Sequence, residues 1–90
     1  MRKEQDWFEA MFLSGNGKLA ANEGSLEAMK ATIDKTNAHC IATGWNPSKY
    51  MIVHVEYYKW LDDDGLFVKS EEYRSRVEIY PETLGAGEQK

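Results

Sequence analysis

The first part of the chain carries hydrophobic residues at helical spacing. Within residues 3–13 the apolar stripe consists of Trp7, Phe8, Met11 and Phe12. Acidic residues stand early in this segment, where the dipole of a helix favours negative charge. The pattern predicts an amphipathic helix over residues 3–13. The SGNG sequence at residues 14–17 predicts its end, with Gly15 as a left-handed cap, and residues 18–24 are expected to form a connection.

A second helical pattern follows and is longer. Ser25 is a suitable N-cap, and Gly44 followed by Pro47 gives the expected stop signal. One face between these signals carries Leu26, Met29, Ile33 and Cys40. We therefore expect a helix over residues 26–43. The alternative ends the helix near Asn37 and makes residues 39–45 a short extra strand, because apolar and polar residues alternate there.

From Lys49 onward the period changes to two, which is typical of strands. Residues 49–61 and 66–80 are rich in β-branched and aromatic side chains, and the acidic DDDG turn joins them into a hairpin. A two-residue loop would make Val53 and Val55 face Arg76 and Arg74. A three-residue loop, residues 63–65, gathers the apolar side chains on one face and gives glycine the left-handed position of the turn. That face would carry Met51, Val53, Val55, Tyr57 and Leu61 beside Phe67, Tyr73, Val77 and Ile79.

These elements predict an α+β fold with two helices followed by an antiparallel β-hairpin, in the order ααββ. Ninety residues are too few for two independent cores, so residues 1–81 are expected to form a single domain. Pro81 is expected to end the second strand, and residues 82–90 are expected to form a flexible C-terminal tail.

The outer face of this hairpin has a polar middle and an apolar tip. In the three-residue-loop register Trp60 lies opposite Val68, with Tyr58 and Leu66 beside them. Two helices on the inner face leave these four side chains without a cover, and exposed apolar patches of this kind mark contact sites. The first helix or the segment around Trp45 is one possible cover. The others are a second copy that extends the sheet by dimerisation and a different protein.

We therefore predict a protein-binding surface on the hairpin, with apolar anchors and a polar rim. The anchors are Tyr58, Trp60, Leu66 and Val68, and the rim consists of Glu72, Arg74 and Arg76. The alternative function is single-stranded nucleic-acid binding, in which rings of this outer face stack on bases and its arginines hold phosphates. Glutamates on the same face would repel phosphates, so nucleic acid is the weaker prediction.

Charge and composition narrow the choice. A net charge of −4 is unfavourable for DNA or an anionic membrane surface. The single cysteine, Cys40, excludes an internal disulfide framework. The sequence contains neither a secretory signal pattern nor an apolar segment of membrane-spanning length, so a cytosolic location is expected.

No motif indicates a catalytic, metal or cofactor site. The SGNGK segment at residues 14–18 lacks the first glycine and the Ser or Thr of a phosphate-binding loop. Cys40 with His39 and His54 falls short of a structural zinc set, and His54 is expected to be a surface residue in a charge network. The sequence thus predicts a small non-enzymatic interaction protein without a cofactor. An adaptor or inhibitor of the kind found in phages and mobile elements fits that description.

Overall fold

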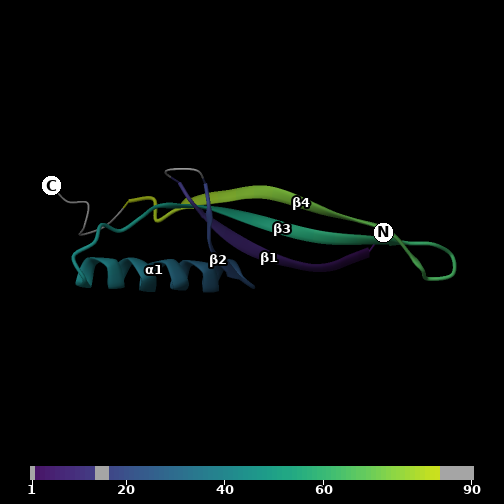
Figure 1. The fold of residues 1–90 in the computed structure, drawn as a ribbon, viewed down its shortest axis with the longest axis horizontal. Helices are drawn as coiled ribbons and strands as arrows, with labels where there is room; N and C mark the ends of the chain where they lie inside the picture. The colour runs from purple at the N-terminus through teal and green to yellow at the C-terminus, as the bar shows by residue number, and fades with distance from the viewer. Residues whose placement is uncertain (1, 14–16, 84–90) are drawn as a thin grey trace.

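The computed structural model describes residues 2–13 and 17–83, and they form a four-stranded antiparallel sheet with one helix (Figure 1). The strand order is β2-β1-β3-β4. The elements are β1 (Arg2–Phe12), β2 (Leu19–Glu23), α1 (Leu26–Ala42), β3 (Tyr50–Leu61) and β4 (Phe67–Tyr80). The predicted arrangement of two helices followed by a hairpin is therefore wrong, because the first predicted helix is a strand of the sheet.

Strand β1 pairs with β3 along its length, from Arg2 opposite Lys59 to Phe12 opposite Tyr50. Its side chains alternate between two half-buried faces: Phe8 and Ala10 lie beneath α1, whereas Trp7 and Glu9 lie on the other side. Large residues on both faces of a strand also satisfy helical spacing, which explains the incorrect prediction of a helix.

Residues 19–23, expected to belong to a connection, form strand β2. It pairs antiparallel with β1 from Glu23 opposite Phe8 to Leu19 opposite Met11. β2 covers the outer edge of only the second half of β1. The predicted cap at Gly15 and most of the predicted tail, residues 84–90, lie outside the described residues.

The long helix is confirmed. Ser25 caps α1 by accepting a hydrogen bond on its side-chain oxygen from the N–H of Ala28 at 3.1 Å. Gly44, just past the end of the helix, has a φ of +87°, a left-handed conformation that glycine adopts without strain. The alternative with a strand near residues 39–45 is wrong, since α1 continues to Ala42.

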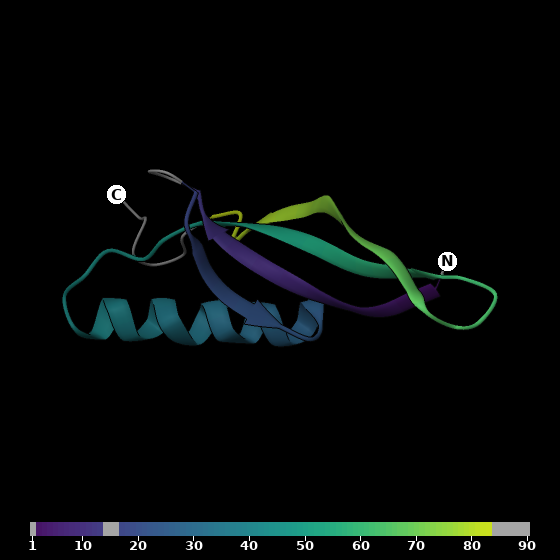
Figure 2. The same ribbon diagram turned by 45° about the vertical axis from the view of Figure 1, so that its right-hand side comes forward.

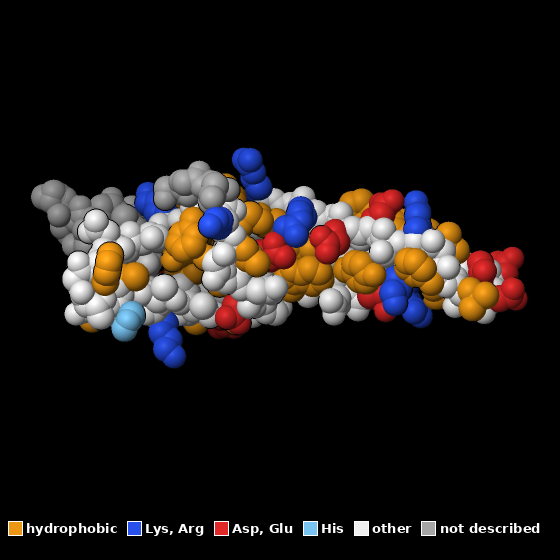
Figure 3. All heavy atoms as spheres, viewed as in Figure 1, with side chains coloured by type: hydrophobic (Ala, Val, Ile, Leu, Met, Phe, Trp, Pro, Cys, Tyr) orange, Lys and Arg blue, Asp and Glu red, His pale blue; other side chains and the backbone are white. Residues whose placement is uncertain are grey.

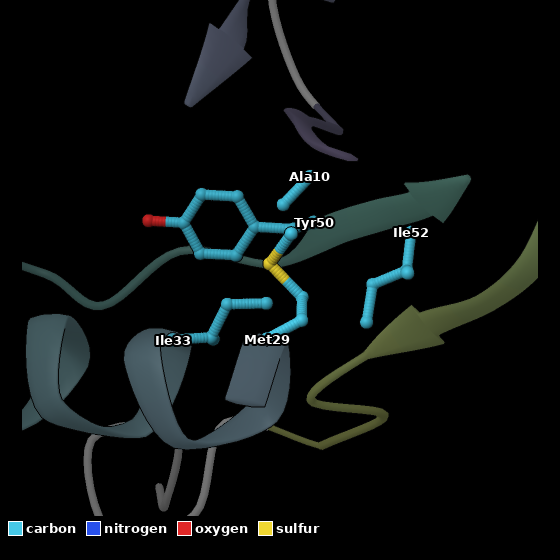
Figure 4. Packing of buried hydrophobic residues seen from close by; sticks show 5 residues of the cluster. All are labelled: Ala10, Met29, Ile33, Tyr50 and Ile52. Carbon is cyan, nitrogen blue, oxygen red and sulfur yellow. The ribbon is translucent and has the colours of Figure 1, made fainter. Parts of the chain in front are cut away.

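The hydrophobic core lies between α1 and one half of the sheet. Met29 and Ile33 of the helix contact Ala10 of β1 and Tyr50 and Ile52 of β3, and all five are at most 4% exposed (Figure 4). We call the sheet surface beneath and in line with α1 the helix face, and the opposite surface the open face.

Polar contacts fix α1 at both of its sides and near its C-terminal end. Asn37, which is buried, bonds to both backbone groups of Ser48 just before β3, at 2.9 and 3.0 Å. The hydroxyl of Thr32 donates to Glu23 of β2 at 2.6 Å, and that of Tyr80 in β4 donates to Asp34 at 2.9 Å. The helix is therefore tied to both edge strands.

The β3–β4 hairpin has the predicted strands but not the predicted register. Two residues of β4 have no partner in β3 and form bulges. Val68 stands between the pairs Leu61–Phe67 and Trp60–Lys69, and Val77 stands between the pairs Val53–Arg76 and Ile52–Glu78. The bulge at Val68 moves the side chains that follow it to the opposite face of the sheet, and the bulge at Val77 returns the later side chains to their predicted face. The loop has three residues, as predicted, but the extra residue Val68 makes Arg74 and Arg76 lie opposite Val55 and Val53.

The sheet is much longer than the helix that covers it (Figures 1 and 2). The molecule measures 61 × 22 × 18 Å. α1 lies against the half of the sheet that contains β2, and the β3–β4 turn lies at the other end, on an arm made of β1, β3 and β4. The sheet is therefore not two-stranded, and β1 of the same chain occupies the edge of β3 that a lone hairpin would leave open.

Candidate functional site

The turn between β3 and β4 is held by its own hydrogen bonds. The backbone N–H groups of Asp62 and Gly65 donate to the carbonyls of Leu66 and Asp62, both at 2.9 Å. The carboxylate of Asp62 also accepts from the N–H groups of Asp64 and Leu66, at 2.9 and 2.8 Å. Gly65 has a φ of +81°, so glycine occupies the predicted left-handed position. The turn therefore holds the residues beside it in a defined position.

Three consecutive apolar side chains beside this turn face solvent. Leu66 is 63% exposed, Phe67 is 60% exposed and Val68 is 58% exposed. Phe67 lies opposite Leu61, which is also exposed, and Val68 is the extra residue of the bulge. We call these four residues the tip surface. Since α1 covers only the other end of the sheet, the helix does not reach the tip surface (Figure 1).

Trp60, a predicted anchor, is partly covered within the chain. It lies opposite Lys69, not opposite Val68, because of the bulge. The Lys69 ammonium sits 4.7 Å from the centre of the Trp60 ring and 3.3 Å from a carboxylate oxygen of Glu71. This cation–π contact covers part of the ring face that was predicted to bind a partner protein.

Tyr58, a second predicted anchor, is also engaged. Its ring meets that of Tyr73 edge to face, with ring centres 5.3 Å apart, and its hydroxyl donates to Glu56 at 3.3 Å. The hydroxyl of Tyr73 donates to Glu71 at 2.7 Å. This hydrogen bond raises the pKa of Tyr73 and lowers that of Glu71. Tyr58 therefore belongs to a polar network on the helix face of the arm.

The predicted rim does not surround the predicted anchors. Glu72, Arg74 and Arg76 lie on the open face, whereas Tyr58 and Trp60 lie on the helix face. The partners of the three rim residues across the hairpin are, in the same order, Tyr57, Val55 and Val53. The prediction assumed a β4 strand without bulges, and the extra residue Val68 turns the segment that follows it over.

Arg74 has a structural partner in β1. Its guanidinium donates to Glu9 at 2.6 Å, and the indole N–H of Trp7 donates to the same carboxylate at 2.9 Å. Glu9 is only 7% exposed. Burial acts to raise the pKa of Glu9, but the hydrogen bonds from Arg74 and Trp7 and the charge of Arg74 together lower it below its ordinary value. Arg74 thus compensates a buried carboxylate.

This arrangement removes the main support for nucleic-acid binding. The prediction required Arg74 and Arg76 beside the rings of Tyr58 and Trp60, and the two pairs lie on opposite faces. Lys69 does lie beside the rings, but it is paired with Glu71. No second function is therefore retained for this surface.

The tip is acidic as well as apolar. Asp62, Asp63 and Asp64 form the turn next to the tip surface, and all three are exposed. Figure 3 shows acidic side chains gathered at one end of the long axis with hydrophobic surface next to them. Any partner that covers the tip surface must also accommodate these three negative charges.

Two kinds of candidate residue escaped the sequence analysis. Phe67 was assigned to the face that the helices were expected to cover. Its exposure could not be predicted, because it depends on which end of the sheet the helix covers. Asp6 was placed in a helix, whereas in β1 it lies opposite Glu56 and near His54, 3.4 Å from the His54 Nε2 atom. Cys40 and His39, by contrast, lie in the last turn of α1, as expected.

Comparisons with known proteins do not assign this chain to a family. No described helix is long and apolar enough to cross a membrane. The description of the chain as a phage-type inhibitor, which accompanied the two-helix architecture, finds no support in a small sheet-dominated fold with one helix and is not retained. Comparison of the chain with protein-family models, with curated proteins and with solved structures gives no match.

Proposed function

We propose that this chain is a small protein-interaction module that inserts its hairpin tip into an apolar pocket on another protein. The observation that carries the proposal is the contiguous exposure of Leu66, Phe67 and Val68, each about three-fifths exposed, beside a well-bonded turn. An apolar segment held at the end of a long arm is already ordered, so docking requires little additional loss of conformational freedom.

The tip surface supplies an apolar anchor for a larger interface, because a specific protein–protein contact buries about 1,000 Å² or more in total. The exposed parts of Leu66, Phe67 and Val68 amount to about 250 Å², which at about 25 cal/mol per Å² corresponds to about 6 kcal/mol of burial before the costs of association. Phe67 has the largest share because an aromatic side chain presents the most area. We therefore assign the role of central anchor to Phe67.

The charge of the tip defines the chemistry of the partner. Asp62, Asp63 and Asp64 are exposed beside the anchors, so the pocket is expected to carry Lys or Arg side chains at its rim. A second copy of the chain is disfavoured as the occupant, because two tips that meet would bring six aspartates together and the whole chain carries a net charge of −4. An anionic membrane surface is disfavoured for the same reason.

The cytosol is part of this proposal. Cys40 is a free cysteine that is partly buried in the helix, and a lone free thiol suits a reducing compartment.

The test uses the position of Phe67 itself. A photoreactive phenylalanine analogue at position 67 should crosslink a specific protein in a lysate of the source cells, and that protein is then purified and measured against the intact chain. Phe67→Ala should weaken its binding about 30-fold, which corresponds to about 2 kcal/mol. Binding should also weaken as salt rises, because the aspartates contribute electrostatic attraction.

Trp45→Ala is the matched control. Trp45 is 73% exposed and lies in the segment between α1 and β3, and Figure 1 shows this segment at the end of the molecule away from the hairpin turn. Its replacement should leave affinity within about twofold of the unmodified chain, whereas loss of binding on Phe67→Ala identifies the tip. The proposal fails if no protein is crosslinked from position 67, if both variants weaken binding equally, or if the crosslinked protein is a second copy of this chain.

A further inference from the structure

A cluster of possible metal ligands lies on the helix face of the arm, just beyond the core. Its members are Asp6 of β1 and His54 and Glu56 of β3. Asp6 lies directly opposite Glu56, and Phe8 lies opposite His54, so all three ligands belong to neighbouring pairs of one two-stranded ladder. Each residue offers one ligand atom, and these atoms lie within 4.8 Å of one another.

The spacing of the Asp6 and His54 ligand atoms suits a transition-metal ion. Asp6 Oδ2 and His54 Nε2 are 3.4 Å apart. Bonds of about 2.0–2.2 Å to a tetrahedral Zn²⁺ ion place two ligand atoms about 3.4 Å apart. Glu56 needs only a side-chain rotation to complete the set, and its partial exposure allows that movement.

The imidazole is held in place before any ion arrives. The rings of His54 and Phe8 are stacked, with centres 4.7 Å apart and planes inclined by 17°. Phe8 in turn packs against the hydrophobic core. On the other side of the cluster, the hydroxyl of Tyr58 donates to Glu56 Oε2 at 3.3 Å. Hydrogen bonds to a ligating carboxylate, such as that from Tyr58, are typical of metal sites.

The cluster already attracts a cation. The ammonium of Lys3 lies 3.1 Å from Asp6 Oδ2 and 3.5 Å from Glu56 Oε2. It brings one positive charge to two carboxylates, and it is an exposed, flexible side chain that can leave at little cost. A divalent ion matches the charge of both carboxylates, and an imidazole ligand favours Zn²⁺ over Mg²⁺ or Ca²⁺.

We propose that Asp6, His54 and Glu56 form a binding site for Zn²⁺ or a similar divalent transition-metal ion, from which the ion displaces the ammonium of Lys3. Three protein ligands leave the fourth tetrahedral position to water. The site lies on the arm between the core and the tip and is independent of the docking proposed for the tip surface.

The experiment is a titration of the metal-free chain with Zn²⁺ at pH 7, followed by calorimetry and by the NMR signals of the His54 ring. The intact chain should bind one ion and shift the His54 signals. His54→Phe should weaken binding at least tenfold, because it removes the ligand nitrogen while preserving a ring that stacks on Phe8. Lys3→Met should tighten binding, because the competing ammonium is gone.

Separate variants exclude the other donors in the chain. A double variant, His39→Gln with Cys40→Ala, should bind Zn²⁺ as the intact chain does, and Asp6→Asn should weaken binding. Circular dichroism spectra that match the intact chain establish that each variant is folded. The proposal is overturned if Zn²⁺ does not saturate the chain below about 1 mM, if His54→Phe binds as well as the intact chain, or if affinity disappears in the His39–Cys40 variant. Unchanged or weaker affinity in Lys3→Met overturns the displacement of the ammonium.

Discussion

Replacing Arg74 with methionine keeps most of the length of the side chain and removes the positive partner of Glu9. The side chain of Glu9 is 9% exposed and that of Arg74 is 45% exposed, and their closest atoms are 2.6 Å apart. The variant therefore leaves a buried negative charge with one remaining donor, the indole N–H of Trp7. Removing one partner of a buried ion pair lowers the free energy of unfolding far more than removing both, because it leaves a buried charge unpaired.

The size of the effect follows from these exposures. Removal of one partner from a fully buried ion pair costs about 3–5 kcal/mol. Arg74 is nearly half exposed, so water can reach part of the vacated space, and we expect a loss of about 2 kcal/mol in the free energy of unfolding. For a domain of this size that loss lowers Tm by about 8–16 °C.

Urea unfolding followed by far-ultraviolet circular dichroism measures the loss. Arg76→Met is the control, since Arg76 lies on the same face of β4, is exposed, and has no ion-pair partner among the residues that the structure describes. It should cost less than about 0.5 kcal/mol. Adding Glu9→Gln to Arg74→Met should restore part of the stability, because the buried charge is then removed. Equal losses in Arg74→Met and Arg76→Met would refute the reasoning.

The same variant has a predicted pH dependence. In the intact chain the pKa of Glu9 is lowered on folding, so the stability from the pair is complete above the unfolded pKa and is lost as pH falls through the folded value. Without Arg74, burial raises the pKa of Glu9, so the folded variant binds a proton more readily than the unfolded one. The stability difference between the two proteins should therefore be largest near neutral pH and shrink as the pH falls toward about 4.

Two further variants test the attachment of the helix. Met29→Ala should lower the free energy of unfolding by about 2–4 kcal/mol, because Met29 is fully buried against Ile52 in a small core; a loss below about 1 kcal/mol in urea unfolding would mean that the helix packs loosely. Asn37→Ala should cost about 2 kcal/mol, because both of its hydrogen bonds to Ser48 are lost in a buried setting, and a thermal melt that matches that of the intact chain would contradict this account.

The second half of the fold was accessible from the sequence. Ser25 and Gly44 mark the ends of α1 through local backbone chemistry, and Gly65 marks the turn for the same reason. Pro81 follows the end of β4, as predicted. Signals of this kind act within a few residues of the position that they specify, so the local structure that they predict does not depend on distant parts of the chain.

The first half and the register were not accessible, because both depend on distant partners. β1 lies between β2 and β3 and is half-buried on both faces, so its apolar residues do not alternate clearly with polar ones. The pairing of Arg74 with Val55 is favoured by Glu9, a residue 65 positions away in a strand that was not predicted. The anchor role assigned to Trp60 depended on the same register, and Phe67 and Leu66 carry the exposed apolar surface instead.

The two bulges in β4 have a consequence for the behaviour of the protein at high concentration. β4 is the last strand on its side of the described sheet, and its outer row of backbone groups is a potential template for fibrous aggregation. Val68 and Val77 interrupt that row near its two ends, and the segment between them carries five charged side chains: Lys69, Glu71, Glu72, Arg74 and Arg76. A foreign strand would find a twisted and highly charged stretch to pair with, which disfavours the growth of fibrils from this edge.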